Sequence, residues 1–270
     1  MSTTEIPATL VKELRDLTGA GMMDAKRALQ ETSGDLEAAR TLLRERGMAA
    51  AGKRAGRETT EGEVIASVAG NVGAIVAIGC ETEPVSKNQD FLGFAERVFE
   101  AVEQGGPEAA EALEEERLEL AAKLGENIVV VDAARIEATE GELLAEYVHP
   151  PANKIGVLVK VRGDNPAAGR RVAMHIASAA PRWVRREEIP ADVVSAEREL
   201  FMRSDEVQSK PEQAREKIVE GMLGKRFFGA YPGGALLEQE WIHESGKKVG
   251  QALQEEGLEV IEFRRFALAE

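Results

Sequence analysis

The stretch Glu63-Val64-Ile65-Ala66-Ser67-Val68 is followed, after the turn candidate Ala69-Gly70-Asn71, by Val72-Gly73-Ala74-Ile75-Val76-Ala77-Ile78. Both stretches are rich in β-branched residues, and their apolar positions recur with a period near two, which is typical of paired strands. A Gly-Asn turn between two such runs favours a tight antiparallel connection. The sequence therefore predicts a β-hairpin at 63–78.

A similar pattern occurs again downstream. Gly141-Glu142-Leu143-Leu144-Ala145 followed by Ile155-Gly156-Val157-Leu158-Val159 repeats the first hairpin with a longer turn. Residues of helical period follow each hairpin, at 90–103 and at 167–180, and 258–266 has the composition of a closing strand. We interpret this as an internal duplication and predict an α+β fold, in which each half is a hairpin with helices on one face.

The N-terminal part has helical rather than strand periodicity. Leu10, Val11, Leu14 and Leu17 form one helical stripe, a second helix is predicted to begin near Met22, and Asp35 is a candidate N-cap for a third. The small-residue stretch 47–56 then predicts a flexible or helical connector. The expected domains are a three-helix module with its linker (1–56), a first α+β half (57–140) and a second half (141–270).

Within the second half, 192–225 reads as two helices broken at Ser209-Lys210-Pro211. Two helices joined by so short a break form a helical hairpin. We expect this hairpin to project from the core as an arm.

Charge and cysteine content limit the possible functions. The chain of 270 residues has a formal net charge of −14, whereas phosphate-backbone binding depends on cationic side chains, so we expect no direct nucleic-acid partner. One cysteine and three histidines without paired spacing predict neither a structural metal site nor a disulfide. No membrane-length apolar run and no secretory signal are present, so we expect a cytoplasmic protein without a membrane partner.

Motifs of covalent chemistry are weak. Gly47-x4-Gly52-Lys53 follows the phosphate-loop pattern, but Arg54 stands where a Ser or Thr should bind magnesium, and no strand precedes it. Cys80 is interpreted as a buried, inert thiol, and His175 as a packed or surface residue of a helix rather than a base. The sequence predicts no catalytic residue and no cofactor.

A loop stands out as a candidate site. Cys80-Glu81-Thr82-Glu83-Pro84-Val85-Ser86-Lys87-Asn88 leaves an apolar strand and enters a helix, which places a carboxylate and a rigid proline at an exposed tip. From composition alone, a strand-to-helix turn without a binding role is the favoured interpretation.

Specific stretches resemble the family of bacterial elongation factor Ts. They are Leu10–Arg15 with Leu17–Leu29, Gly34–Ala39, Cys80-Glu81-Thr82, Gly125-Glu126-Asn127-Ile128, His149 with Ile155–Val159, Ala173–Ala177, Lys217–Gly221 and Leu236–Gln239. The resemblance covers nearly the whole chain. It implies a guanine-nucleotide exchange factor of elongation factor Tu in protein biosynthesis, without covalent chemistry, and an N-terminal module of the ubiquitin-associated type.

The resemblance also implies site residues. Met22 and Met23 would lie in the part of the module that docks on the partner's nucleotide-binding domain. One of them can instead fill the three-helix core, but we expect one, or both in part, to be presented at the surface, because adjacent helical residues point about 100° apart. Ile128 and His149 correspond to family positions near the same interface, although Ile128 can equally be a core residue at the start of a strand.

The loop matches the family's Thr-Asp-Phe-Val segment, which enters the partner and displaces its magnesium ion. Here the segment is Thr82-Glu83-Pro84-Val85, so the acidic position is kept and the aromatic is replaced. An aromatic side chain buries roughly 150–250 Å², far more than proline can. The lost aromatic leaves open one alternative, a binding chaperone of elongation factor Tu with weak or no exchange activity. The phosphate-loop pattern at 47–53 leaves open another, an enzyme that binds nucleotide through this stretch.

Overall fold

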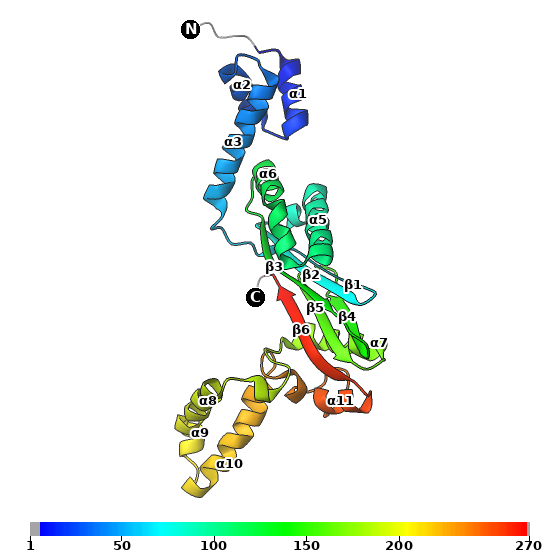
Figure 1. The fold of residues 1–270 in the computed structure, drawn as a ribbon. Helices are drawn as coiled ribbons and strands as arrows, with labels where there is room; N and C mark the ends of the chain where they lie inside the picture. The colour runs from blue at the N-terminus through cyan, green and yellow to red at the C-terminus, as the bar shows by residue number, and fades with distance from the viewer. Residues whose placement is uncertain (1–5, 269–270) are drawn as a thin grey trace. The chain divides into compact units, whose positions relative to one another are not determined.

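The computed structural model describes residues 6–268, which fold into two compact units. The first unit takes in the described chain up to Ile65, Val76–Ala133 and Leu268, and the second takes in Ala66–Ile75 and Ala134–Ala267. Helices and two small sheets combine in an α+β fold, as predicted (Figure 1). No helix in the described part of the chain is both long and apolar enough to cross a membrane.

Three helices open the first unit: α1 (Ala8–Thr18), α2 (Met22–Glu31) and α3 (Leu36–Arg54). Leu14 and Leu29 are fully buried at the centre of their small core. The Asp35 side chain accepts a hydrogen bond from the backbone N–H of Ala38 at 2.9 Å, so its predicted capping role is confirmed. Leu17 differs from the predicted stripe, because its side chain is 56% exposed.

The predicted connector is the second half of α3. Its alanines favour helix, and Gly47 lies so close to α6 (Glu114–Leu124) that an added Cβ would be 2.6 Å from the Cβ of Ala122. Backbone N–H groups inside a helix bond to carbonyls one turn back and do not form a phosphate cradle. The helical conformation of 47–54 therefore argues against the phosphate-loop alternative.

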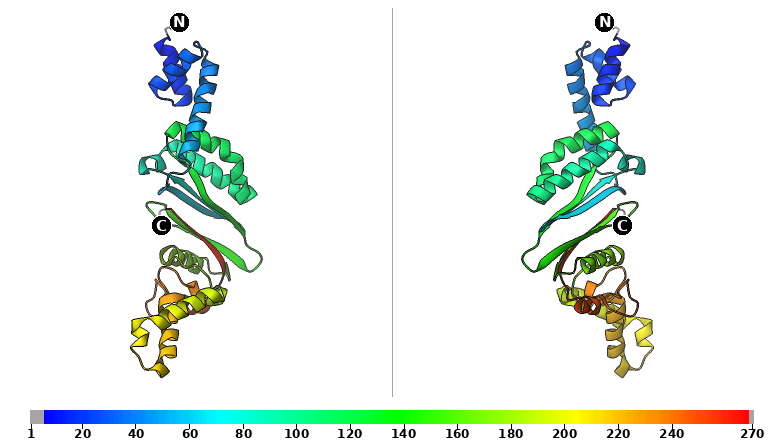
Figure 2. Two further views of the ribbon diagram at one scale, coloured as in Figure 1. Left: turned by 90° about the vertical axis from the view of Figure 1, so that its left-hand side faces the viewer. Right: turned by 90° about the vertical axis from the view of Figure 1, so that its right-hand side faces the viewer.

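The first sheet has the strand order β1-β2-β3, with bounds β1 (Glu61–Ala69), β2 (Val72–Cys80) and β3 (Val129–Glu137). The predicted hairpin is confirmed, and Gly70 takes a positive φ of 63° in its turn. The short helix α4 (Glu83–Ser86), then α5 (Gln89–Gly105), a 3-10 turn (Pro107–Leu113) and α6 connect β2 to β3. Figures 1 and 2 show α5 and α6 on the same side of this sheet.

The second unit is built on an antiparallel sheet of order β4-β5-β6, with β4 (Glu142–Val148), β5 (Ile155–Arg162) and β6 (Glu259–Ala267). Ala145 pairs with Val159, and Val159 pairs with Phe263, which confirms the second hairpin and the closing strand. The helix α7 (Pro166–Ala179) packs against the sheet through a common apolar core.

The remaining helices of the second unit are α8 (Ala191–Arg203), α9 (Asp205–Gln208), α10 (Glu212–Met222) and α11 (Val249–Glu255). A π-helical turn (Leu223–Phe228) and two 3-10 turns (Arg186–Glu188 and Leu236–Glu238) complete it. The first helix of the predicted hairpin ends earlier than expected, because Ser204 is extended and separates α8 from α9. Arg198 on α8 forms ion pairs with Glu216 and Glu220 on α10.

His175 is part of a buried polar group in the second unit. Its Nε2 lies 3.1 Å from the Gln239 Oε1 atom, and the backbone N–H of Ile242 points to its Nδ1. The Gln239 amide in turn donates to the carbonyls of Ala179 and Ala230. Of the two interpretations, packed or surface, the structure supports the packed one, because His175 is fully buried. Burial lowers the pKa of His175 to about 4, so the imidazole is neutral.

Candidate functional site

The loop that follows β2 is exposed at its tip and anchored at its base. Cys80 is fully buried, whereas Thr82, Glu83 and Pro84 are exposed and Val85 is half-buried. Thr82 has extended backbone angles and precedes α4, whose first turn contains Pro84. Proline fits there because the first helical N–H groups have no intrahelical acceptor. The Cys80 thiol donates a weak hydrogen bond to the Thr82 carbonyl at 3.4 Å.

Glu126 holds this loop from the segment between α6 and β3. Its carboxylate accepts hydrogen bonds from the backbone N–H groups of Glu81 and Thr82, both at 3.1 Å, and from the Thr82 hydroxyl at 2.5 Å. Hydrogen bonds to an ionised acceptor are shorter and stronger than neutral ones. Glu126 therefore fixes the loop at the residue just before its exposed acidic tip.

A second set of contacts starts from a loop residue, Glu81. The carboxylate of Glu81 accepts a hydrogen bond from the backbone N–H of Asn127 at 2.7 Å and lies 3.3 Å from the guanidinium of Arg57. The Asn127 side chain is buried and donates to the carbonyl of Arg57 at 2.8 Å. The loop base, the α6–β3 segment and the end of α3 thus meet at one place.

The predicted interface methionines lie at the surface of the small helical module. Met22 and Met23 are the first two residues of α2, with exposed fractions of 60% and 62%. The prediction that at least one of them is presented at the surface is confirmed, and the structure exposes both. Leu17, at the end of α1, is also exposed, so three apolar side chains are exposed around the turn between α1 and α2.

The two other predicted residues lie elsewhere. Ile128 is fully buried just before β3, which agrees with the core interpretation, and its assignment to an interface stays a prediction. His149 belongs to the second unit, is exposed, and its Nδ1 lies 2.9 Å from the Tyr147 hydroxyl. Its backbone N–H donates to Ile155 at the start of β5.

Glu81, Glu126 and Asn127 were not predicted as site residues. Each lies in a stretch that resembles the family, which was the only signal in the sequence. Their contacts join residues 24 to 72 positions apart, so no local periodicity reveals them.

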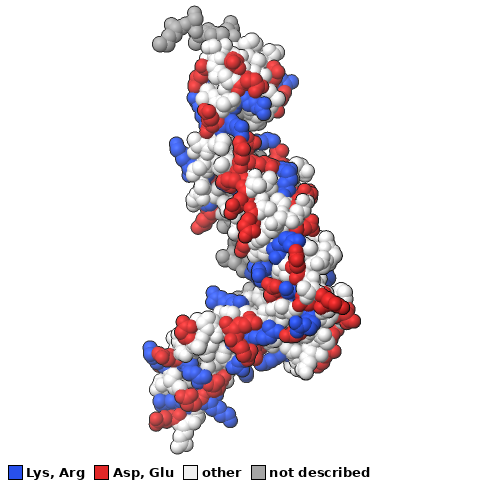
Figure 3. All heavy atoms as spheres, in the orientation of Figure 1, with Lys and Arg blue, Asp and Glu red and all other residues white. Residues whose placement is uncertain are grey.

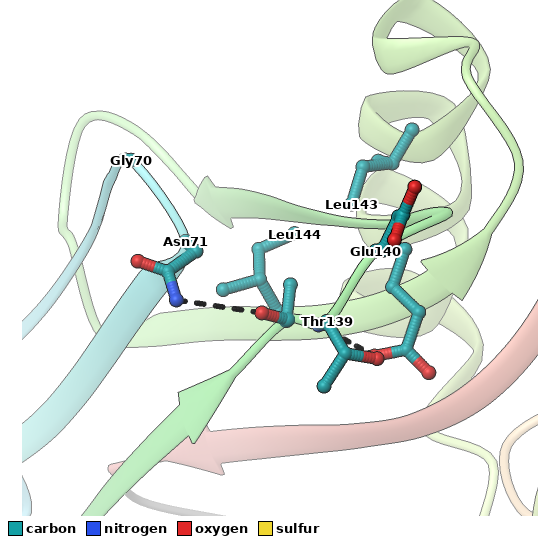
Figure 4. Close-up of a pocket in the computed structure, with 8 residues that line it drawn as sticks. Gly70, Asn71, Thr139, Glu140, Leu143 and Leu144 are labelled. Atoms are coloured by element: carbon teal, nitrogen blue, oxygen red, sulfur yellow. Dashed lines mark hydrogen bonds between the residues drawn. The ribbon is translucent and has the colours of Figure 1, made fainter.

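A hollow of about 560 Å³ lies in the second unit (Figure 4). It is lined by Gly70, Asn71, Ala138, Thr139, Glu140, Glu142, Leu143 and Leu144. Two hydrogen bonds join its polar groups: Asn71 donates to the Ala138 carbonyl, and the Thr139 N–H donates to the Glu142 carboxylate. None of the predicted site residues lines it.

Charged side chains are interspersed on the face shown in Figure 3, with acidic ones gathered over α6. Carboxylates of α6 form ion pairs: Glu119 with Arg44, Glu116 with Arg97, and Glu114 with Arg117. The Arg117 contact lowers the pKa of Glu114. Among the described residues no group of His, Cys, Asp and Glu could hold a metal ion.

The fold and the site define a class of protein: an α+β protein with an N-terminal helical module, whose candidate site is an exposed, anchored loop rather than a pocket. The family model for elongation factor TS matches residues 81–270. This chain belongs to the elongation factor Ts family, a family of translation factors.

Relatives match over almost the whole chain. Elongation factor Ts of Methylococcus capsulatus is 39% identical over 278 residues, which cover 98% of this chain and 92% of the relative. Elongation factor Ts of Escherichia coli K12 is also 39% identical, with the same coverage of both chains. The Serratia proteamaculans protein of the same name is 38% identical.

Proposed function

We propose that this chain binds elongation factor Tu in its GDP form and accelerates GDP release, so that GTP can be loaded. The observation that carries the proposal is the Thr82–Val85 loop, which is exposed at Glu83 and Pro84 and held at Thr82 by Glu126. A loop fixed before binding loses little conformational entropy when it enters a partner, so more of its contact energy is available to deform that partner.

In this mechanism the loop shifts the elements of the partner that hold its magnesium ion and the β-phosphate of GDP. Loss of the cation removes charge compensation from the diphosphate, so the nucleotide leaves faster. The factor needs no covalent step, because it acts by binding the nucleotide-free partner more tightly than the GDP complex. Met22 and Met23 would provide a separate grip, with His149 and Ile128 as further interface positions.

We also propose how the parts of this fold correspond to those of the family. The helices α1–α3 correspond to a module of the ubiquitin-associated type, α8–α10 to the family's helical arm, and the two hairpins to a duplicated core. The domain boundaries near 57 and 141 stay predictions, as do a cytoplasmic location, the absence of a nucleic-acid partner and the absence of a cofactor.

Release of fluorescent GDP from elongation factor Tu, followed by stopped flow, tests the function. Wild-type protein should accelerate release strongly, and excess magnesium should reduce the acceleration. Glu83→Ala should slow release more than it weakens binding, whereas Glu140→Ala, which removes another exposed carboxylate, should change neither. Equal losses of rate and affinity in Glu83→Ala would contradict a displacing role for the loop.

One observation favours a second function, that of a binding chaperone. Pro84 stands where the family has an aromatic residue, and its small ring is exposed at the tip. A stable complex with an unchanged GDP release rate would establish the chaperone and exclude the exchange factor.

A further inference from the structure

Asn127 connects two parts of the first unit that are distant in sequence. It is 2% exposed, and its side-chain amide donates to the carbonyls of Arg57 at 2.8 Å and Ala55 at 3.5 Å. Ala55 is the C-cap residue directly after α3, and Arg57 follows two residues later. A buried amide that satisfies carbonyls left open at a helix end holds that end in place.

The backbone of the same residue faces the loop. The N–H of Asn127 donates to the Glu81 carboxylate, and Glu81 also contacts the Arg57 guanidinium. Asn127, Glu81 and Arg57 therefore form a closed ring of contacts. The preceding residue, Glu126, accepts a hydrogen bond from Thr82. The two residues 126 and 127 therefore contact both the base of the loop and the residues that follow α3.

The helix α3 can carry this constraint to the methionines. It is continuous over 19 residues, and at Gly47 it approaches Ala122 of α6 closely. Arg44 forms ion pairs with Glu115 and Glu119 on the same face of α6. Its N-terminal half packs against α1 and α2 through Ala39 and the partly buried Leu36.

We propose that Asn127 is a positioning residue that locks the end of α3 to the base of the Thr82–Val85 loop, so that the exposed methionines and the loop reach the partner as one rigid surface. This inference rests on the proposed function for the identity of the partner. Two contact sites joined by a rigid connector bind with a high effective concentration, which falls when the connector loosens.

The first test needs no partner. Spin labels attached to Met23→Cys and Glu83→Cys, both at exposed positions, report the distance between the module and the loop in the full chain, while Cys80 is fully buried. Asn127→Ala should broaden the distance distribution. Glu81→Gln, which keeps an acceptor oxygen but removes the charge facing Arg57, should broaden it less.

The matched control is Asn71→Ala, which removes an exposed asparagine whose amide also donates to a backbone carbonyl, that of Ala138. It should leave the distribution unchanged. Circular dichroism melting shows that each variant is folded at the temperature of the measurement. Unchanged distributions in folded Asn127→Ala and Glu81→Gln would overturn the proposal.

The second test measures affinity for nucleotide-free elongation factor Tu. Asn127→Ala should weaken binding about tenfold, because the effective concentration of the second contact falls. In a Met22→Ala/Met23→Ala background the same change should cost less than about twofold, since no second contact remains to be positioned. An equal loss in both backgrounds would show that Asn127 acts on the loop alone and would overturn the coupling.

The two tests separate this inference from the function on which it rests. If the wild-type chain does not bind elongation factor Tu, the proposed function fails, while the label distances still report whether Asn127 fixes the module to the loop.

Discussion

The carboxylate of Glu126 accepts hydrogen bonds from both the backbone N–H and the hydroxyl of Thr82, 44 residues earlier in the chain. Glu126 thereby acts on the loop through its base and leaves the tip free, because Glu83 and Pro84 remain exposed. The loop thus combines a fixed backbone with accessible side chains.

Glu126→Ala should destabilise the protein and slow GDP release together. Removal of the acceptor leaves two backbone N–H groups and one hydroxyl without their partner, which should lower the free energy of unfolding by about 1–2 kcal/mol. Urea unfolding and stopped-flow GDP release measure the two effects. Glu126→Gln keeps an acceptor oxygen and should recover part of both; a variant with normal stability and normal release would contradict the anchoring role.

Pro84→Phe should restore the aromatic side chain of the family segment. Because the position is exposed, the free energy of unfolding should change by less than about 0.5 kcal/mol. The maximal rate of GDP release should rise if an aromatic wedge adds to the existing loop. The expected pattern is a rise in rate at unchanged thermal stability; a fall in rate would indicate that proline itself is required.

Met22→Ala and Met23→Ala should weaken binding to elongation factor Tu by about 1 kcal/mol each without lowering stability. Both side chains are more than half exposed, so their truncation removes little buried area from the folded protein. Isothermal titration calorimetry and thermal unfolding separate the two properties. Leu29→Ala is the contrasting variant, because Leu29 is fully buried and its loss should destabilise the module.

His175 should make stability depend on pH. Its pKa is about 4 in the folded protein and about 6.5 when unfolded, so the neutral form favours the folded state. This contribution is complete above pH 6.5 and is lost as the pH falls toward 4. Between pH 7.5 and 5 the loss should be about 2 kcal/mol.

Urea unfolding of wild-type protein and a His175→Gln variant at both pH values isolates this effect from the carboxylates that titrate in the same range. The variant is expected to be less stable at pH 7.5, with a smaller decrease toward pH 5. Parallel pH dependences of the two proteins would refute the assignment to His175.

Gly62→Ala should destabilise the first sheet more than Gly70→Ala does. Both glycines have positive φ, at 138° and 63°, so alanine is strained at either position. At Gly62 an added Cβ would also lie 2.0 Å from the carbonyl oxygen of Ile78, whereas Gly70 has open space around it. We expect a loss of about 1 kcal/mol for Gly70→Ala and more than about 2 kcal/mol for Gly62→Ala, measured by urea unfolding.

The parts of the fold that depend on local pattern could be predicted from the sequence. Alternating apolar residues marked both hairpins, and the Asp35 cap marked the start of α3. The glycines at 47 and 52 leave both a flexible and a helical connector possible. In the structure α3 continues through both glycines, and Gly47 packs on Ala122. That contact joins residues far apart in sequence, so helix propensity does not predict it.

The candidate site also has one part that local sequence predicts and another that it does not. The exposed tip at Glu83 and Pro84 follows from a strand, a turn and a proline, which are local signals. The anchoring by Glu126 and Asn127 depends on how the α6–β3 segment meets the loop, and this is a property of the folded chain.

Because α3 is one continuous helix, it fixes how α1 and α2 are rotated about its axis. Each residue of an α-helix advances the chain by 1.5 Å and turns it by about 100°. One alanine inserted between Gly47 and Arg54 would therefore turn α1 and α2 about the helix axis by more than a quarter of a circle, and the faces of α3 on the two sides of the insertion would no longer align. Seven inserted residues, close to two full turns, would nearly restore the orientation while moving the methionines about 10 Å along the axis. The number of residues in α3 thus sets both the direction in which the methionines face and their distance along the helix axis.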